Sequence, residues 1–334
     1  MATLGATYLT LADLFKQQEG DGSITATIIE MLAETNEILQ DMIVVQCNNG
    51  TKHLTTSRTG LPAGTWRRLY QGVQPTKSTV RQVTDTTGFL ESWSEIDSKL
   101  VELSANPAQF RLNESAAFIE GMSNDMATAL FYGNTDTDPE QFMGLSPRFN
   151  SLSAENGGQI IDAGGTGADN ASIWFVVWGE RTTHALYPKG ATAGLGRDDK
   201  GKETKTNSDG SLLDVHREKF TWDIGLSVRD WRYVSRIANI DVSNALAGSV
   251  QLFDFMLKAY YKLQQRRVIG GRTSIYCNTN MRQVLDSLST NAGQNDSFIR
   301  LRPGKDIQGE EVDMYRKIPV RECDALLSTE ARVT

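Results

Sequence analysis

The sequence predicts an α+β fold, in which helices and strands are mixed without regular βαβ alternation. Three observations carry this prediction. Residues 106–133 have the three-and-four spacing of one long amphipathic helix, residues 173–178 form an almost uninterrupted apolar run of strand length, and residues 220–237 alternate between apolar and polar side chains as antiparallel strands do. With 334 residues, of which 39% are hydrophobic, the chain can bury a substantial core in one large domain or two.

The composition limits the class of protein. There are 34 lysines and arginines against 41 aspartates and glutamates, and the net charge of -7 argues against electrostatic binding of nucleic acid over the whole surface, although a local basic patch is allowed. Cys47, Cys277 and Cys323 are far apart and form no CxxC pair, so we expect ordinary thiols in a reducing compartment rather than a disulfide framework or a zinc knuckle. The sequence has no signal peptide and no membrane-spanning run, and we expect a soluble intracellular protein.

The N-terminal region predicts two amphipathic helices and a short strand. Residues 10–18 place apolar side chains on one helical face, Gly20 and Gly22 break the pattern, and residues 23–42 form a second apolar face. The pattern becomes strand-like at residues 43–46. The two helices are expected to cover a core, and the sequence leaves open whether that core belongs to the same subunit.

A strong Asn-Gly turn signal at residues 49–50 precedes a long two-stranded excursion. Apolar side chains alternate from residue 66 to 69 and again from residue 80 to 83, which places the predicted turn near residues 72–75. Because an isolated hairpin is only marginally stable in water, we expect this one to pack on a neighbouring molecule. The hairpin is basic, and an arm of this kind could contact nucleic acid or lie across an acidic neighbouring subunit. Its aromatic residues and alternation favour the second interpretation.

The region at residues 106–133 predicts one long helix, about 40 Å at 1.5 Å per residue. Asn106 can cap it, Pro107 suits its first turn and Gly133 suits its exit. We expect one apolar stripe to face a core, formed by Leu112, Ala116, Phe118, Ile119, Met122, Met126 and Leu130. The opposite face carries Glu114, Glu120, Asn124 and Asp125. The loop that follows the helix is expected to be anchored by Phe142, Met143 and Leu145.

The second half of the chain predicts further strands and helices. The apolar run at residues 173–178 should be a central strand that is buried on both faces. Residues 189–210 are glycine-rich and charged, and predict a surface loop or hairpin tip. A single amphipathic helix is expected over residues 243–267, with two arginines at its C-terminal end. The remaining predicted elements are antiparallel strands at residues 220–228 and 231–237, a strand at 273–277, a helix at 280–288 and a strand pair at 313–321.

No constellation of catalytic or ligand-binding residues stands out. His53, His184 and His216 have no ligand spacing or nucleophile motif near them. The glycines at residues 164–167 and 194–196 do not continue to GK[ST] and are expected in turns, and the GxSxG, HExxH and EF-hand patterns are absent from the sequence. The sequence therefore predicts no catalytic, cofactor-binding or metal site. A soluble enzyme or ligand-binding module that uses the loop at residues 157–167 is the alternative from a different class.

The buried-strand core, the long helix and the hairpin before it together resemble the HK97-like major capsid proteins of tailed bacteriophages. Residues 58–97 look like the extended E-loop of the major capsid proteins of a group of short-tailed phages, and residues 315–333 are similar to the closing strand of the same group. The resemblance covers nearly the whole chain. It implies a shell subunit that assembles as hexamers and pentamers into an icosahedral head around double-stranded DNA, which it encloses without sequence specificity. An encapsulin-like compartment, which shares the fold, is the alternative within self-assembly.

The resemblance also implies an organisation of the chain. Residues 1–50 would be an N-terminal arm, 51–104 the E-loop, 105–156 a peripheral domain with a long spine helix, 157–309 an axial domain, and 310–334 closing strands that return to the peripheral domain. The arm begins almost at Met1, so we expect a separate scaffolding protein and little or no proteolysis. Lys52 and Lys77 lie in the loop from which some relatives form a covalent crosslink, but the sequence identifies no asparagine or glutamate partner for them.

The implied partners are other copies of the chain, a scaffolding protein, a portal, and a cementing or decoration protein, with no membrane and no cofactor. The implied location is the capsid of the virion, after synthesis in the host bacterial cytoplasm. We expect the contacts between subunits to come from the hairpin, through Arg58, Trp66, Arg67, Arg68, Leu69, Tyr70, Lys77, Val80, Arg81 and Val83.

Overall fold

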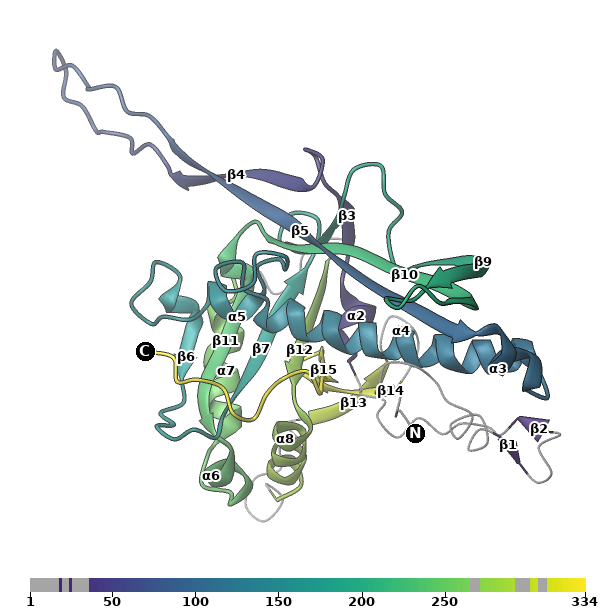
Figure 1. Cartoon of the computed structure of the whole chain (residues 1–334). Helices are drawn as coiled ribbons and strands as arrows, with labels where there is room; N and C mark the ends of the chain where they lie inside the picture. Colours follow the sequence, from purple (N-terminus) through teal and green to yellow (C-terminus); the bar gives the residue numbers. More distant parts are fainter. Residues whose placement is uncertain (1–17, 20–23, 26–35, 265–270, 292–300, 306–310) are drawn as a thin grey trace. The chain divides into compact units, whose positions relative to one another are not determined.

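The computed structural model describes residues 18–19, 24–25, 36–264, 271–291, 301–305 and 311–334 (Figure 1). The helix predicted at residues 10–18 lies almost entirely outside these ranges, and so does most of the one predicted at residues 23–42. The described part of the helix predicted at residues 23–42 contains the short helix α2 (Ile38–Asp41). The strand expected after it is confirmed as β3 (Val44–Gln46).

The chain divides into two compact units. The larger unit takes its described residues from 35–88, 128–191 and 224–334, and the smaller unit from 1–34, 89–127 and 192–223. Three of the boundaries between the units fall within elements, namely β5 (Thr79–Asp97), α4 (Pro107–Tyr132) and β10 (Leu212–Val228).

The sheet of the larger unit is organised around β7 (Asn170–Trp178), in which every residue is buried. This confirms the central strand predicted from the apolar run. β7 is antiparallel to β11 (Val234–Asp241) on one side and to β12 (Arg272–Cys277) on the other. Because both faces and both edges of β7 are covered, an unbroken apolar sequence is the pattern that its position requires.

Further strands extend this sheet in both directions. Next to β11 lies the parallel β6 (Ile160–Asp162), and next to β12 lies the parallel β15 (Ile318–Glu322). β15 and β14 (Glu311–Tyr315) form the predicted C-terminal pair, and β13 (Leu301–Lys305) is antiparallel to β14. β8 (Thr183–Tyr187) pairs with β3, β7 and the end of β10. The β14–β15 turn has positive φ at Arg316 and Lys317, the conformation of a tight two-residue hairpin.

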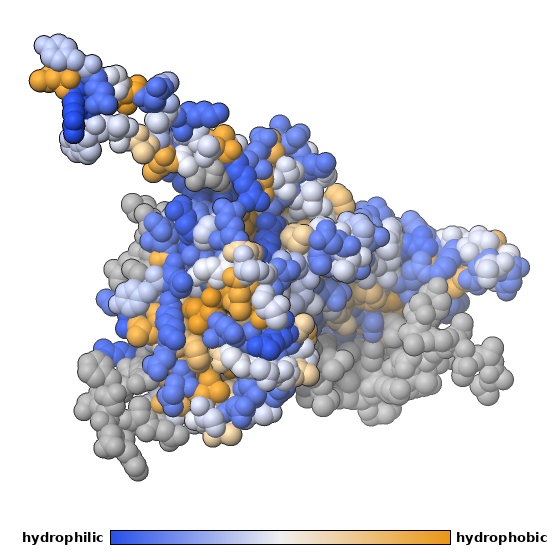
Figure 2. Space-filling model, turned by 90° about the vertical axis from the view of Figure 1, so that its left-hand side faces the viewer, coloured by the Kyte–Doolittle hydropathy of each residue, from blue (hydrophilic) through white to orange (hydrophobic). Residues whose placement is uncertain are grey.

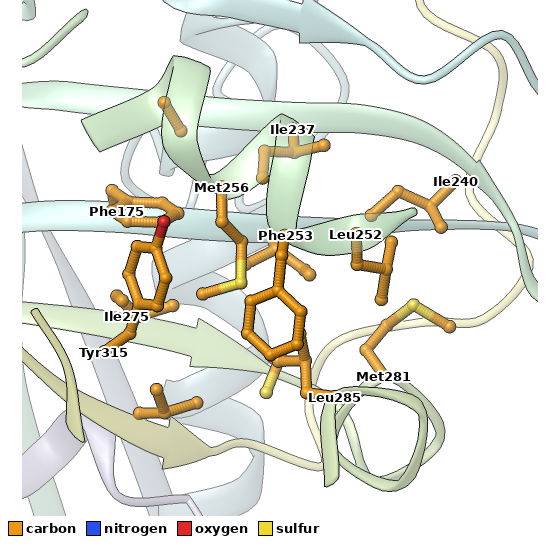
Figure 3. Packing of buried hydrophobic residues seen from close by; sticks show 14 of the residues in the cluster. Phe175, Ile237, Ile240, Leu252, Phe253, Met256, Ile275, Met281, Leu285 and Tyr315 are labelled. Carbon is orange, nitrogen blue, oxygen red and sulfur yellow. The ribbon is translucent and has the colours of Figure 1, made fainter. Parts of the chain in front are cut away.

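Helices α7 (Leu252–Lys262) and α8 (Thr279–Asn291) cover one face of the sheet and form the main core with it (Figure 3). In Figure 3 the side chains of both helices point toward those of the strands, among them Phe175, Leu252, Phe253, Met256, Ile275, Met281, Leu285 and Tyr315. β12 and α8 confirm the strand and the helix that the sequence predicts in this region.

The single helix predicted over residues 243–267 is wrong, because the structure has two helices there. α6 (Val242–Leu246) ends before Gly248, which has φ +77 and donates its N–H to the carbonyl of Ala245. A glycine adopts this left-handed conformation without strain, and the chain leaves the helix at that point. α7 then buries Phe253 and Met256, whereas Leu257 is 36% exposed.

The limits of the long helix are confirmed by α4. The side chain of Asn106 accepts the N–H of Gln109 at 3.3 Å, and Pro107 is the first helical residue. Gly133 follows the last one and donates its N–H to Ala129 at 2.9 Å. A Cβ atom added at Gly133 would lie 2.5 Å from the carbonyl oxygen of Phe142, so only glycine fits this exit.

The predicted face of α4 is wrong in the half of the helix that belongs to the smaller unit. Leu112 is 53% exposed and Ile119 is 36% exposed, although both were expected in the buried stripe. Ser115 is buried instead, because its hydroxyl donates to the carboxylate of Glu218 at 2.7 Å. Arg111 pairs with the same carboxylate at 2.5 Å. Burying Glu218 requires these polar partners, and turning them inward leaves Leu112 in solvent. Met122, Met126 and Leu130 are buried as predicted.

Half of the segment predicted as a surface loop or hairpin tip at residues 189–210 is a strand, β9 (Gly196–Thr206), which is antiparallel to β10. Residues 189–195 are turns and bends, and residues 207–211 form the tip of the hairpin. β9 is exposed along most of its length, which explains its lack of apolar residues. Charged pairs hold the strands together instead, among them Arg217 with Glu203 at 2.7 Å and Lys202 with Asp214 at 3.4 Å.

Short elements complete the structure. These are β1 (Gln18–Glu19) and β2 (Ile24–Thr25), which are antiparallel, α3 (Ser98–Leu103), α5 (Leu145–Arg148), η1 (Gly157–Gln159) and η2 (Trp231–Tyr233). Phe142 and Leu145 are buried and anchor the loop after α4 as predicted, and Met143 is half-buried. Within the described ranges, every helix is too short or too polar to cross a lipid bilayer.

Candidate functional site: the hairpin arm

The hairpin arm, residues 52–88, belongs to the larger unit. β4 (Lys52–Gly60) pairs antiparallel with the first part of β5, from Lys52 opposite Thr86 to Gly60 opposite Thr79. The tip segment, residues 61–78, extends beyond the end of this pairing (Figure 1). The structure thus confirms a long two-stranded excursion before α4.

The details predicted for the tip are wrong. Residues 66–69 are not in a strand, and the turn lies at Leu69 and Tyr70 rather than at residues 72–75. Tyr70 has φ 67, and the N–H of Gln71 donates to the carbonyl of Arg68 at 3.2 Å. The tip contains two prolines, at positions 62 and 75, which have no N–H for a strand ladder, so pairing stops near Gly60.

The apolar side chains of the arm project into solvent. Trp66 is 101% exposed, Leu69 86%, Tyr70 105% and Val80 61%, whereas Val83 is half-buried. In Figure 2 the tip is the narrow projection at the upper left, where apolar and charged residues lie next to one another. A cluster of large apolar side chains without any cover marks an interaction surface.

The arm is also strongly basic. Residues 51–84 contain six lysines and arginines and no aspartate or glutamate. Arg81 pairs with Glu155 at 3.2 Å. In the part of the chain that the structure describes, the other predicted contact residues of the arm have no carboxylate partner, namely Arg58, Arg67, Arg68 and Lys77.

Polar contacts fix the base of the arm to the larger unit. Asp85 is buried and pairs with Arg148 at 2.8 Å, and it accepts the hydroxyl of Ser227 at 2.7 Å. Ser57 donates to the carbonyl of Arg229 at 2.8 Å. The sequence prediction missed Asp85 and Arg148. The available signal was that Asp85 is the first acidic residue after the long basic stretch.

A cavity of about 670 Å³ lies at this base. Its lining includes five arginines, at positions 58, 81, 148, 229 and 232, which come from β4, β5, α5 and the segment after β10. Arg58 and Arg81 are residues that the sequence predicts as contacts, and the structure brings both to this cavity. The other predicted contact residues, except Val83, do not line it.

Two of the three histidines meet beside the arm. The rings of His53 and His184 lie edge to face with centroids 5.4 Å apart. Burial, together with the charges of His53 and Arg229, lowers the pKa of His184 to about 4, so its imidazole is neutral at pH 7. Burial also lowers the pKa of His53.

The described residues include all three histidines and all three cysteines of the chain. None of their histidines, cysteines, aspartates and glutamates form a group of three that could hold a metal ion. Cys47, Cys277 and Cys323 are buried free thiols. The glycines near residue 165 form a turn against β11, where the N–H of Gly165 donates to the carbonyl of Asn239 at 2.8 Å.

Comparison with known proteins agrees with this geometry. A family model described as major capsid protein GP7 matches residues 19–334. A chain of the cryo-EM structure of bacteriophage Epsilon15 is 39% identical, with a TM-score of 0.78 over 100% of both chains. The capsid of bacteriophage JBD30 shares the fold at 12% identity, with a TM-score of 0.52 over 95% of this chain and 99% of that one. An encapsulin of Synechococcus elongatus has a TM-score of only 0.44 at 12% identity, which is too low to support that alternative.

Among curated proteins, the comparison found no significant match. The family match spans nearly the whole chain and the Epsilon15 match spans all of it, and the mixed helix and sheet architecture is that of HK97-like capsids. The chain therefore belongs to the GP7 family of major capsid proteins, and it is a structural subunit of the shell of a tailed bacteriophage.

Proposed function

We propose that this capsid protein assembles as hexamers and pentamers into an icosahedral head, and that the hairpin arm joins each subunit to a neighbour. The observation that supports this is the exposure of Trp66, Leu69 and Tyr70 on a tip segment that has no strand partner. These side chains gain a dry environment only when another subunit covers them.

The proposed mechanism is collective. Full burial of a large apolar side chain such as Trp66 or Leu69 contributes about 1.5–3 kcal/mol. One such contact is weak, but a closed shell repeats it at every subunit interface. The unpaired basic residues of the arm, among them Arg67 and Arg68, favour an acidic surface as the place where the tip lies.

In this proposal residues 1–50 form an N-terminal arm, 51–104 the E-loop, and 105–156 a peripheral domain whose spine helix is α4. Residues 157–309 form the axial domain, and 310–334 return to complete the peripheral domain. Support comes from the order of the elements along the chain, since the hairpin arm directly precedes α3 and α4 and the strands β14 and β15 come last.

The proposed head encloses double-stranded DNA without reading its sequence. A subunit with a net charge of -7 fits a container that must not hold the packed DNA tightly. A separate scaffolding protein, a portal and a cementing or decoration protein would complete the particle. Subunits would be made in the host bacterial cytoplasm.

The proposal is tested by replacing exposed apolar residues of the tip segment with charged ones. The variant with Trp66→Asp and Leu69→Asp should remain a folded subunit but form shells with a yield at least about tenfold lower, because every copy of the contact in a shell is weakened. Negative-stain electron microscopy and sedimentation velocity measure the yield. Leu212→Asp is the matched control, because Leu212 is also exposed, at 69%, but lies outside the arm. Normal capsids from the double variant would contradict the proposal.

A further inference from the structure

The cavity at the base of the arm carries unbalanced positive charge. Its lining holds five arginines but only two acidic residues, Glu155 and Asp230. Arg81 pairs with Glu155 at 3.2 Å and Arg232 with Asp230 at 2.7 Å.

The remaining three arginines of the lining differ in their partners. Arg148 is held by Asp85 at 2.8 Å. In the described part of the chain, Arg58 and Arg229 have no carboxylate partner. The two lie on adjacent segments, since Ser57 donates to the backbone of Arg229 at 2.8 Å.

Both residues line a hollow rather than a flat surface. Arg229 donates one guanidinium N–H to the backbone carbonyl of Glu180 at 2.9 Å, a neutral acceptor that leaves its charge unbalanced. Phe149 and Trp231 contribute apolar walls to the same cavity. A guanidinium group with an apolar surrounding binds carboxylates through paired hydrogen bonds, and partial exclusion of water strengthens those bonds. The cavity is therefore built for an anionic group that the rest of the described chain does not supply.

The same chain presents a loop of the opposite charge. Residues 112–147 contain six aspartates and glutamates and no lysine, arginine or histidine. Three of the acidic residues, Asp136, Asp138 and Glu140, are exposed in the acidic loop, residues 134–141, and form no ion pair within the described ranges. The acidic loop belongs to the larger unit, like the cavity.

The acidic loop is held in a fixed shape. The N–H of Asp138 donates to the carbonyl of Asn134 at 2.9 Å, and the N–H of Asp136 donates to the side chain of Asn134 at 3.0 Å. Phe142, which follows the loop, is only 3% exposed and ties it to the core. Little conformational entropy is therefore lost when these carboxylates bind a partner.

We propose that the cavity at the base of the arm binds the acidic loop of a second copy of this chain. The cavity and the loop are complementary in charge, and neither is paired with the other within one subunit. Because they are different surfaces of the same chain, the contact is head-to-tail. A head-to-tail contact forms rings such as hexamers and pentamers when the rotation between neighbours closes, as the proposed function requires. This inference rests on the proposed function and names a contact within it.

A charge exchange tests the pairing. Arg58→Glu should lower the yield of shells at least about tenfold, because it turns attraction into repulsion, and Asp136→Lys with Asp138→Lys should do the same. The combination of all three substitutions should restore at least half of the wild-type yield, measured by sedimentation velocity and electron microscopy. The unfolding midpoints of these exposed-site variants should match wild type.

The control combines Arg67→Glu, at the tip and outside the cavity, with the same loop substitutions, and should not restore assembly. Failure of the triple variant to exceed the single-site variants would overturn the pairing. Normal shells from Arg58→Glu would also overturn it. The same holds if the loop variant assembles normally while Arg58→Glu does not, because that result would indicate another anionic partner for the cavity. If wild-type protein formed no shells, the proposed function itself would fail. Failure of the proposed contact is therefore distinguishable from failure of the proposed function.

Discussion

Glu330 shows how one buried carboxylate holds a segment near the C-terminus in place within the larger unit. Its carboxylate is 6% exposed and accepts hydrogen bonds from Arg236 at 2.8 Å, from Ser172 and from Tyr132. Burial and the adjacent charge of Glu330 raise the pKa of Tyr132 above its usual value, so the phenol stays a donor. A segment near the C-terminus is thereby fixed to β7, β11 and the end of α4.

Removing this carboxylate should be costly. Glu330→Ala leaves the guanidinium of Arg236 buried without its counter-charge, and we expect a loss of about 3–5 kcal/mol in the free energy of unfolding. Urea denaturation of purified subunits measures it. Glu140→Ala is the control, because Glu140 is exposed, and should change the free energy by no more than about 0.5 kcal/mol. Equal midpoints for both variants would refute the role given to Glu330.

His184 should make the subunit sensitive to acid. Its pKa falls from 6.5 to about 4 in the folded protein, chiefly through burial. As the pH falls below about 6.5 the unfolded state therefore takes up a proton before the folded state does, and stability is lost down to about pH 4, by on the order of 3 kcal/mol. Asp85 is a nearby charge that raises this pKa, and it is itself paired with Arg148.

The measurement is the thermal midpoint of the subunit at several pH values between about 7 and 4. We expect His184→Leu to show a smaller fall than wild type over this window, because the leucine binds no proton. Parallel curves for the two proteins would mean that other groups cause the acid sensitivity.

At the scale of elements, the orientation of α4 in the smaller unit is set by polar contacts rather than by its most apolar stripe. Glu218 of β10 receives Arg111 and Ser115, and Phe118 stacks on Phe220 with ring centroids 5.7 Å apart. The buried line on this part of the helix therefore runs through Ser115, Phe118 and Met122.

A matched pair of substitutions tests this orientation. Met122→Ala should cost about 2–5 kcal/mol because Met122 is 4% exposed and its removal leaves a cavity. Leu112→Ala should change stability by no more than about 0.5 kcal/mol, since Leu112 is 53% exposed. Chemical denaturation of both variants measures the free energy of unfolding. If Leu112→Ala lowered it as much as Met122→Ala does, the stripe predicted from the apolar spacing would be favoured instead.

The elements that the sequence predicted correctly carry their signal within a few residues. β7 is a continuous apolar run, and α4 has its cap, its proline and its exit glycine next to its ends. The rotation of α4 depends on Glu218, about a hundred residues away, and no local pattern contains that contact. The break at Gly248 contradicts the predicted single helix because apolar spacing continues across this glycine, although a glycine also suits a helix end.

In the candidate site, too, the features with local sequence signals were predictable and those that depend on long-range contacts were not. The arm was predictable because alternation and the Asn-Gly turn are local signals. The prediction for its tip is wrong, because the alternating apolar residues indicate a strand whereas two prolines exclude continuous pairing. The cavity could not be predicted, because Arg58, Arg148 and Arg229 meet only after β4, α5 and the end of β10 have packed together.

At the scale of the whole molecule, charge and apolar surface are distributed as an assembling subunit requires. Residues 51–84 carry six basic residues and no acidic one, while residues 112–147 carry six acidic residues and no basic one. An isolated subunit exposes the hairpin arm, with Trp66, Leu69 and Tyr70, and the three carboxylates of the acidic loop. Contacts between copies can neutralise the opposite charges and cover the apolar side chains. Both effects favour the closed shell over the free subunit.

The most direct test of this account is a cryo-EM reconstruction of shells assembled from the wild-type protein, at a resolution that shows side chains in residues 61–78. The account predicts that the tip segment lies across an adjacent subunit, with Trp66 and Leu69 buried in that contact. Shells in which this segment points into solvent, or folds back onto its own subunit, would contradict it.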